Sequence, residues 1–267
     1  MRTVNYEFLR PGEIIEEKKR FPVVYFPIGP LEWHGPHLAL GMDPLNAAAI
    51  SKKVAENIGG VVMPVFYWGT ERERDPQMLK NIGFKGDEWI IGMDFPANSM
   101  PSFYAKEDVF GLAVRECLTQ LVKQGYKLIV IINGHGAENH INTLVRLAKE
   151  FTNQTDSTVL YTMTTFLDDG GTQDYGHASK IETSILSYLY PDCVDLSSLP
   201  PLEHKLYNTD FSIVDDATFR GRPNPDFSVT DDPRDASQEL GKKIMEKSVK
   251  LISRLVMDTY NNFSKNA

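Results

Sequence analysis

Five of the six histidines fall in three short segments, each of which also carries a glutamate. The segments are "EWHGPH" at 32–37, "NGHGAENH" at 133–140 and "YGHASKIETS" at 175–184. Imidazole and carboxylate groups from separate loops are common ligands of zinc and similar divalent ions, and a carboxylate can bridge two of them. If the fold brings the three segments together, their composition predicts a metal centre.

The first segment lies within "GPLEWHGPHLALGMD", and its polar residues have both a metal-binding and a structural interpretation. Glu32 and His34 are two apart in an extended stretch, so their side chains should leave the same face. Asp43 stands where the next helix should begin, where it could also serve only as the N-cap. A single histidine such as His135 at a strand end is often merely hydrogen-bonded. The joint presence of all four residues favours the metal site.

The elements that must position these residues alternate between apolar strands and amphipathic helices. We expect strands at 21–29, 60–68, 127–134 and 157–166, and helices at 43–59, 106–124, from after "HGAEN" to about 151, 180–190 and 235–260. This alternation predicts an α/β fold with a mostly parallel sheet covered on both faces. Ligands of such sheets bind at the carboxyl ends of the strands, where the three segments should converge. A further carboxylate is available there in Glu138 or Glu182.

Composition narrows the class of protein. The 267 residues, 42% of them hydrophobic, suffice for one domain spanning 1–267. The formal net charge of −8 argues against a nucleic-acid partner. We find no apolar run of about 18 residues and no apolar signal core, and two cysteines are too few for a disulfide framework. We therefore expect a cytoplasmic protein that neither binds nor spans a membrane.

Other catalytic patterns have little support. The segment "NGHGAEN" lacks the glycine spacing and the lysine of a phosphate-binding loop, and no Gly-x-Ser-x-Gly elbow occurs. The long polar segment 69–102 should be a functional loop. Trp33 should point away from Glu32 and His34, and any tryptophan could either wall a pocket or pack in the core.

The three histidine segments together resemble the creatininase family of metal-dependent amidohydrolases. The first resembles its Gly-x-x-Glu-x-His-Gly-x-His-Leu…Asp signature. The second, "NGHGAEN", is similar to an Asn-Gly-His-Gly-Gly-Asn turn, and "HASKIETS" is similar to a His-Ala-Gly-x-x-Glu-Thr-Ser motif. The resemblance covers residues 20 to about 195. It implies a three-layer α/β/α sandwich, a centre of two divalent metal ions (zinc, manganese or iron), a small-molecule substrate and a homo-oligomer, commonly a hexamer.

Carried over residue by residue, the resemblance assigns roles at the site. Glu32 and His135 would hold one metal, His34 would hold the other, and Asp43 would bridge them. His177 would face the substrate as the catalytic group. Glu182 is the preferred fifth metal ligand, although the extra residue in "HGAEN" leaves Glu138 open as an alternative.

Two departures from the family pattern point to a substrate other than creatinine. Ser179 replaces the glycine after His-Ala, with Lys180 next to it, and "FPANS" at 95–99 replaces a Phe-Pro-Gly-Thr element. The predicted reaction is attack by a metal-activated hydroxide on the carbonyl of a small cyclic amide or formamide.

Three rival functions remain open from the sequence. One is ring opening of a keto-polyol, which would use the charged loop residues Glu71, Arg72, Glu73, Arg74, Asp75 and Asp94 for hydrogen bonding. The others are a catalytically silent metal-binding subunit and a metal-free sugar-binding protein.

Overall fold

The computed structural model describes residues 2–81, 83–96, 98–164, 176–204, 206 and 232–266. Four parallel strands form one sheet in the order β2-β1-β3-β4. Their bounds are Val23–Ile28 for β1, Val61–Val62 for β2, Leu128–Asn133 for β3 and Thr158–Met163 for β4. The expected parallel sheet is confirmed.

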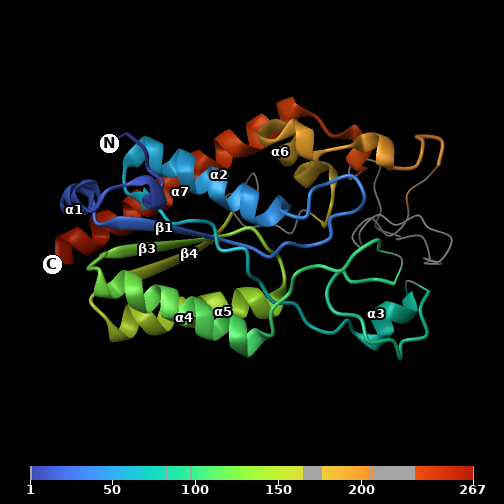
Figure 1. The fold of residues 1–267 in the computed structure, drawn as a ribbon, viewed down its shortest axis with the longest axis horizontal. Coiled ribbons are helices and arrows are strands. Elements are labelled where there is room, and N and C mark those ends of the chain that lie inside the picture. Colours follow the sequence, from blue (N-terminus) through green and yellow to red (C-terminus); the bar gives the residue numbers. More distant parts are fainter. Residues whose placement is uncertain are drawn as a thin grey trace.

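Helices cover both faces of the sheet (Figure 1). One layer contains α2 (Met42–Ile58), α6 (Lys180–Leu189) and α7 (Gln238–Asn266), and the other contains α4 (Glu107–Lys123) and α5 (Glu138–Gln154). Two further helices, α1 (Pro11–Arg20) and α3 (Pro76–Asn81), lie outside these layers. Short 3₁₀ turns span Tyr6–Phe8, Pro191–Cys193, Leu196–Ser198 and Pro233–Asp235. The three-layer α/β/α fold class is thereby confirmed.

The two layers are held by side chains that alternate along the central strands. In β1, Val23 and Tyr25 belong to the core beneath α2, α6 and α7, whereas Val24 and Phe26 belong to the core beneath α4 and α5. Strand β3 alternates in the same way, and every residue of both strands is buried. A continuous apolar run is the sequence pattern of a strand covered on both faces, because each face must be apolar.

The second strand is shorter than the predicted 60–68. Only Val61 and Val62 form regular ladder pairs with β1, since Pro64 has no N–H to donate. The segment still follows β1 loosely, because the N–H groups of Met63 and Phe66 donate to backbone carbonyls of β1 at 2.9 Å. Two helices were not predicted, namely α1 and α3, and the last helix begins three residues later and ends six residues later than expected.

The interpretation of Asp43 as an N-cap is wrong. Helix α2 begins at Met42 and has Gly41 as its N-cap, so Asp43 is the second helical residue. Its carboxylate is therefore not committed to the helix backbone and lies buried at the site described below.

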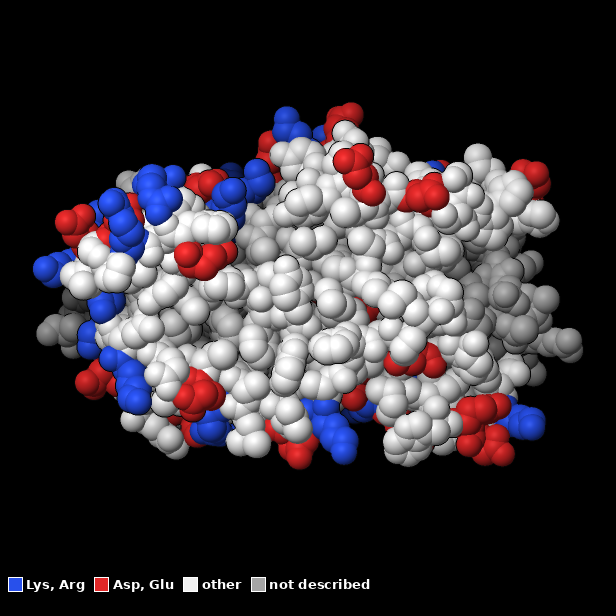
Figure 2. All heavy atoms as spheres, in the orientation of Figure 1, with Lys and Arg blue, Asp and Glu red and all other residues white. Residues whose placement is uncertain are grey.

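Charge on the face seen in Figure 2 is mixed. Lysine and arginine lie among aspartate and glutamate toward the periphery, and the middle of this face carries few charges. Among the described helices, none combines the length and the apolar character needed to cross a membrane. The predictions of a single domain and of no nucleic-acid partner stay predictions.

Gly241 tests the packing of α6 against α7, and a second helical glycine, Gly111, provides the control. A Cβ added at Gly241 in α7 would lie 1.9 Å from the carbonyl oxygen of Ser184 in α6, so we expect Gly241→Ala to destabilise the protein by about 1–3 kcal/mol through overpacking. Gly111 in α4 is the matched control. Its added Cβ would meet the nearest side chain at 3.5 Å, so Gly111→Ala should stabilise by about 0.4–1 kcal/mol. Urea unfolding of both variants measures the difference. Equal stabilisation by both substitutions would contradict the close contact between α6 and α7.

Candidate metal centre

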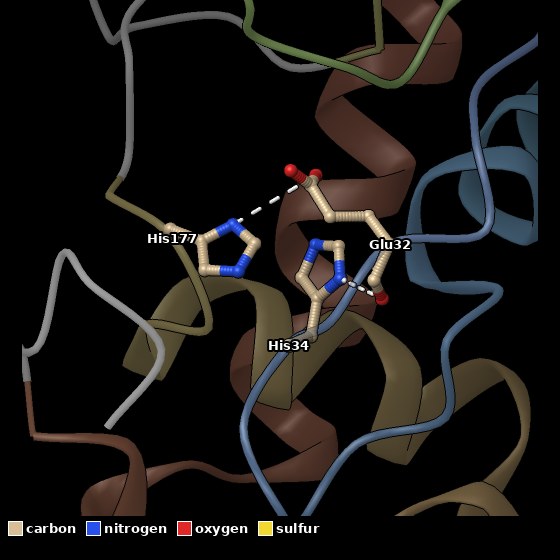
Figure 3. Close-up of side chains that lie close together, drawn as sticks. All are labelled: Glu32, His34 and His177. Carbon is tan, nitrogen blue, oxygen red and sulfur yellow. Dashed lines mark hydrogen bonds and ion pairs between the residues drawn. The ribbon is translucent and has the colours of Figure 1, made fainter. Parts of the chain in front are cut away.

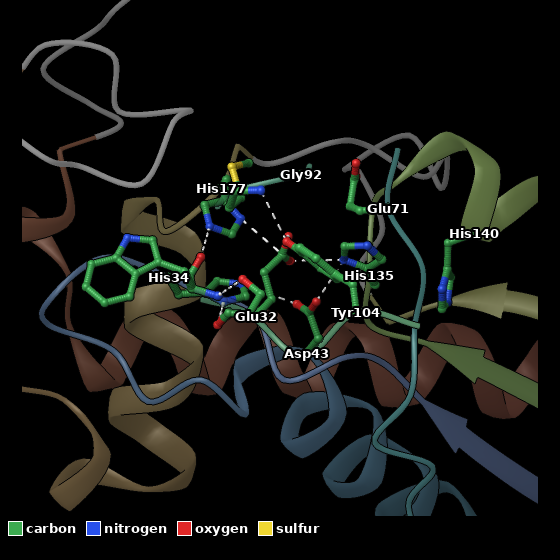
Figure 4. Close-up of polar contacts among 12 residues, drawn as sticks. Glu32, His34, Asp43, Glu71, Gly92, Tyr104, His135, His140 and His177 are labelled. Carbon is green, nitrogen blue, oxygen red and sulfur yellow. Dashed lines mark hydrogen bonds and ion pairs between the residues drawn. The ribbon is translucent and has the colours of Figure 1, made fainter. Parts of the chain in front are cut away.

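The three histidine segments meet at the carboxyl edge of the sheet, as predicted (Figure 4). "EWHGPH" follows β1 and "NGHGAENH" follows its neighbour β3. "HASKIETS" opens α6, which packs with α2 and α7. Part of the connection from β4 to this third segment lies outside the described residues.

Asp43 reaches the centre because two glycines let α2 approach the ends of two strands. A Cβ at Gly134, directly after β3, would lie 2.2 Å from the backbone oxygen of Asp43. A Cβ at Gly29, directly after β1, would lie 2.8 Å from the Cβ of Asp43. Any larger residue at either position would push the helix away. The glycines of "GPLEWH" and "NGHG" therefore have a packing role that brings Asp43 between the two histidine segments.

His34 is fully buried and has a defined orientation. Its Nδ1 donates to the backbone oxygen of Glu32 at 3.0 Å, as Figure 3 shows. This bond turns Nε2 toward the carboxylates, 3.3 Å from Oδ1 of Asp43 and 3.7 Å from Oε2 of Glu182. Fixing one imidazole nitrogen by a hydrogen bond is how proteins present the other nitrogen to a ligand.

Glu32 divides its two carboxylate oxygens between different partners. Oε1 accepts a hydrogen bond from the hydroxyl of Tyr104 at 2.5 Å, whereas Oε2 lies 3.0 Å from Nδ1 of His135. Nδ1 of His135 is also 3.0 Å from Oδ2 of Asp43. Glu32, Asp43 and His135 thus form a compact buried group.

Asn133 holds the backbone of His135 in place. Its Oδ1 accepts from the N–H of His135 at 3.0 Å, and its Nδ2 donates to the oxygen of His135 at 2.7 Å. The same Oδ1 accepts from Nε2 of His140, while Nδ1 of His140 accepts from the N–H of Thr70. Burial, together with the charge on His135, lowers the pKa of His140 well below its usual value. His140 is therefore a neutral structural residue.

His37 also has a structural environment. Its Nε2 lies 3.0 Å from the hydroxyl oxygen of Thr183, and burial lowers the pKa of its imidazole to about 4. Of the five clustered histidines, His34, His135 and His177 are thus the ones that contact the carboxylate groups.

His177 and Glu182 enter from the turn before α6. Nε2 of His177 donates to the backbone oxygen of Trp33, which leaves Nδ1 facing Oε2 of Glu32 at 3.9 Å (Figure 3). Ala178 adopts the left-handed region at φ 52°, which is uncommon for a residue other than glycine and turns the chain sharply after His177. Oε2 of Glu182 accepts from the N–H of Ala178 at 2.6 Å.

The carboxylates of the centre favour positive charge on the histidines beside them. Burial disfavours charge on His34, but the carboxylates of Asp43 and Glu182 outweigh it and raise the pKa of the imidazole to about 10. Burial likewise opposes charge on His135, yet Glu32 and Asp43 raise its pKa well above the usual value. Burial also acts to raise the pKa of Glu32, but His135 and His177 hold it well below its usual range. The buried carboxylates thus draw positive charge to themselves.

The pKa values of Glu182 and His177 are shifted mainly by burial. Burial raises the pKa of Glu182 to about 8, with His34 pulling it down and Asp43 pushing it up. Burial and the charge of His34 lower the pKa of His177 to about 3. Nε2 of His177 is thus used by the Trp33 carbonyl, and Nδ1 is the ring nitrogen that faces Glu32.

The donor set fits divalent ions. Glu32, Asp43 and His135 form one group whose ligand atoms lie within 4.8 Å of one another, and His34, Asp43 and Glu182 form a second. Two donors about 2.1 Å from one tetrahedral ion are roughly 3.4 Å apart, close to the 3.0–3.7 Å contacts found here. Asp43 belongs to both groups. The ligand atoms of a third group, Glu32, His34 and His177, also lie within 4.8 Å of one another.

A cavity of about 510 Å³ opens onto these residues. Its inner wall includes Glu32, Asp43, His135, His177 and Glu182. The outer wall comes mainly from the long loop and the start of α5, and its charged members are Glu71, Arg72, Arg74 and Glu138. The predicted functional loop thus lies beside the centre. The described lining includes neither Trp33, Trp68 nor Trp89, so the structure gives none of the tryptophans a place in the pocket wall.

Glu138 and Glu182 differ in their surroundings. Glu138 is exposed and forms an ion pair with Arg72 across the cavity wall, whereas Glu182 contacts His34. The geometry favours Glu182 as the additional ligand. Trp33, as expected, points away from Glu32 and His34. It packs in a small core with Leu79, Ile90, Met93 and Phe95.

Tyr104 and Asn133 are the polar partners of the site that the sequence interpretation missed. Asn133 stands in the quoted segment and could have been noticed there, because a buried strand ending in asparagine needs partners for its amide. Tyr104 lies just after the long loop, in no recognisable pattern.

Buried carboxylates and imidazoles at the carboxyl edge of an α/β sheet are typical of metal-dependent hydrolases. The family model described as creatinine amidohydrolase matches residues 9–256. This chain belongs to the creatininase family, as its motifs indicated, and is an enzyme of the metal-dependent amidohydrolase type.

Individual relatives agree with this assignment. A creatinine amidohydrolase of Pseudomonas putida is 26% identical over 257 residues, covering 89% of this chain and 90% of that protein. A manganese creatininase structure has 23% identity and a TM-score of 0.67, covering 96% of this chain and 98% of that chain. A creatininase variant of the Zn-Zn type has 22% identity and a TM-score of 0.68, covering 97% and 99%. These two structures share the fold of this chain.

Asn133 provides a test of the scaffold under the centre. Asn133→Ala would leave three polar groups of His135 and His140 without their partner, so we expect a loss of about 1–3 kcal/mol in the free energy of unfolding. Asn153→Ala, on the exposed side of α5, is the control and should change stability by less than about 0.5 kcal/mol. Urea unfolding compares the two. If Asn133→Ala is as stable as the control, the amide does not organise the site.

Proposed function

We propose that this protein is a binuclear metal-dependent hydrolase that cleaves a carbon–nitrogen bond in a small, polar cyclic amide or formamide. The observation that carries the proposal is the pair of ligand groups that share Asp43. A carboxylate with one oxygen toward each group is suited to bridge two cations. The Pseudomonas putida relative, a creatinine amidohydrolase by name, supports an amide substrate.

In this proposal Glu32, Asp43 and His135 hold one ion, and His34, Asp43 and Glu182 hold the other. Two divalent ions bound there would polarise a carbonyl and lower the pKa of water from ~15.7 to about 7. Zinc and manganese are the first candidates because the related structures are of Mn and Zn-Zn types, and iron stays a further possibility.

His177 is the proposed proton carrier. The Trp33 carbonyl occupies Nε2, so Nδ1 is the atom left to exchange a proton beside the carboxylates. The residue lines the cavity and is partly accessible, with 11% of its side chain exposed. An imidazole in this position could accept a proton from the attacking group and return it to the leaving nitrogen.

The outer cavity wall supports a polar substrate. Arg74 donates through Nε to the oxygen of Gly92 at 2.7 Å, which fixes its guanidinium at the wall, and Arg72 is fixed by Glu138. Such groups orient a substrate by hydrogen bonds and reject analogues that lack the matching polar atoms. A ring-opening reaction on a keto-polyol would use the same wall, but the comparisons favour amide hydrolysis.

We also propose that the protein acts as a homo-oligomer in the cytoplasm, with a hexamer as the family expectation. Tyr67, Trp68 and Phe103 support self-association, because these large side chains are 44%, 38% and 59% exposed. Their segments adjoin, since Gly69 pairs with Tyr104. Exposed aromatic groups gathered in this way are typical of interaction surfaces.

Metal stoichiometry tests the ligand assignment. Elemental analysis of protein purified without chelator should give two divalent ions per chain for the wild type and nearly none for Asp43→Ala, which removes the shared ligand. Glu182→Gln should retain one ion, because the group of Glu32, Asp43 and His135 is intact. Glu138→Gln is the matched control and should retain two.

The same measurement can overturn the assignment. Two ions in Asp43→Ala would exclude the bridging role. Two ions in both glutamine variants would mean that the fifth ligand is another group. A wild type that holds no metal and gains none from zinc, manganese or iron would contradict the proposed function.

Activity separates His177 from the metal ligands. We expect His177→Ala to keep two ions per chain and to lose about 10²–10⁴-fold in kcat, because only the proton transfer is removed. Steady-state assays on a panel of cyclic amides and formamides, with metal content measured on the same samples, check this. Full turnover by His177→Ala would exclude the catalytic role, and loss of metal would make His177 a ligand instead.

A further inference from the structure

We propose that Tyr104 is a positioning residue that sets the metal affinity of one half of the centre, the group formed by Glu32, Asp43 and His135. The inference rests on the proposed function, since it assumes that this group binds an ion. Tyr104 is not among the described residues that line the cavity. It acts through Glu32.

The hydrogen bond from Tyr104 decides how Glu32 presents its carboxylate. Its hydroxyl donates to Oε1 at 2.5 Å, so Oε2 is the oxygen turned toward Nδ1 of His135 at 3.0 Å (Figure 4). Without the phenol the carboxylate could rotate about its terminal bond, because no other described side chain donates to Oε1. A ligand free to rotate binds an ion more weakly, since its rotation must be lost on binding.

Tyr104 is itself held from two sides. Phe103 forms an antiparallel bridge with Leu31, and its N–H donates to the oxygen of Leu31 at 2.7 Å, which fixes the backbone directly before Tyr104 next to the residue that precedes Glu32. The phenol oxygen also accepts from the N–H of Met93 at 3.2 Å. Tyr104 is thus held by Met93 of the long loop and by the backbone pairing of Phe103 with Leu31, both independent of the Glu32 carboxylate.

Gly92 provides an independent sign of this tight fit. It has φ +53°, and an added Cβ would lie 2.7 Å from the phenol oxygen of Tyr104. The glycine therefore leaves space for the hydroxyl at the position where it reaches Glu32.

The other half of the centre is positioned by different bonds. Nδ1 of His34 is fixed by the backbone oxygen of Glu32, and Glu182 is fixed by the N–H of Ala178. Neither of these side chains contacts Tyr104 through a described hydrogen bond. Loss of the phenol hydroxyl should therefore weaken one ion and spare the other.

The experiment compares Tyr104→Phe with Tyr25→Phe in full-length protein stripped of metal. Tyr25 is a buried tyrosine whose hydroxyl donates to the oxygen of Gly59 at 3.1 Å, away from the centre, so it controls for the loss of a buried hydroxyl. Zinc affinity is measured by competition with a chromophoric chelator. We expect the zinc dissociation constant of one of the two ions to be 10–100-fold larger in Tyr104→Phe than in the wild type. Tyr25→Phe should bind both ions with wild-type affinity.

A double variant identifies which ion is affected. Glu182→Gln should leave only the group of Glu32, Asp43 and His135, and adding Tyr104→Phe should then weaken the one remaining ion by the same 10–100-fold. Gly92→Ala, whose Cβ would crowd both the phenol oxygen and Cγ of Glu71 at 2.7 Å, should weaken that ion as well and provides a second route if Tyr104→Phe folds poorly.

The outcomes separate this inference from the proposed function. If the wild type binds two ions and Tyr104→Phe binds both with unchanged affinity, the positioning role is wrong and the binuclear centre stands. Equal weakening of both ions, or no effect in the Glu182→Gln background, would also overturn it. A wild type that binds no zinc would remove the proposed function and this inference together.

Discussion

The candidate centre depends on the close approach of α2 to the carboxyl ends of β1 and β3 at Asp43. Gly29 and Gly134 make this approach possible, since a Cβ at either position would collide with Asp43. The contact places a carboxylate from a helix between residues that follow two different strands. Two of the three candidate ligand groups use Asp43, so a shift of this one helix end would open both of them together.

Burying several carboxylates together costs electrostatic free energy, and a nearby positive charge offsets that cost. Three carboxylates and two imidazoles in contact share a site in which Glu32, His34, Asp43 and His135 are almost completely buried. Buried charges cost several kcal/mol each unless they are paired and hydrogen-bonded. The imidazoles respond with raised pKa values, which supplies positive charge from within the chain. A divalent ion bound there would provide the same charge more compactly, which is the physical reason for proposing a metal centre at this group.

The parts that could be predicted from the sequence are those with a strong local pattern. The strands β1 and β3 are continuous apolar runs between glycine and charge, and the parallel topology then dictates that the segments after them meet. The length of β2 could not be predicted from its apolar run alone, because the run continues past Pro64, which lacks a donor. Helix α3 lies in a polar loop and has no amphipathic pattern long enough to notice. Helix boundaries are uncertain from sequence by a residue or two, and at Asp43 that uncertainty decides whether its carboxylate caps the helix or faces the centre.

Contacts between distant parts of the chain could not be predicted in the same way. The bond between Tyr104 and Glu32 joins residues 72 apart in sequence, and no local pattern encodes it. The choice between Glu138 and Glu182 likewise depends on which side chain reaches His34 once α5 and α6 are packed. Such pairings follow from the assembled fold, so a motif can indicate the type of centre without giving its supporting bonds.

The centre and the outer cavity wall come from different parts of the chain, which bears on how the substrate is chosen. The proposed ligands follow strands or open helices of the sheet scaffold, whereas Glu71, Arg72 and Arg74 belong to the long loop. Loops tolerate change better than the elements they connect, so the wall can vary while the ligands stay fixed. The Arg72–Glu138 ion pair and Tyr104 tie this loop to the scaffold. Family membership therefore indicates the amidohydrolase chemistry of the centre, and we propose that residues of this loop select the substrate.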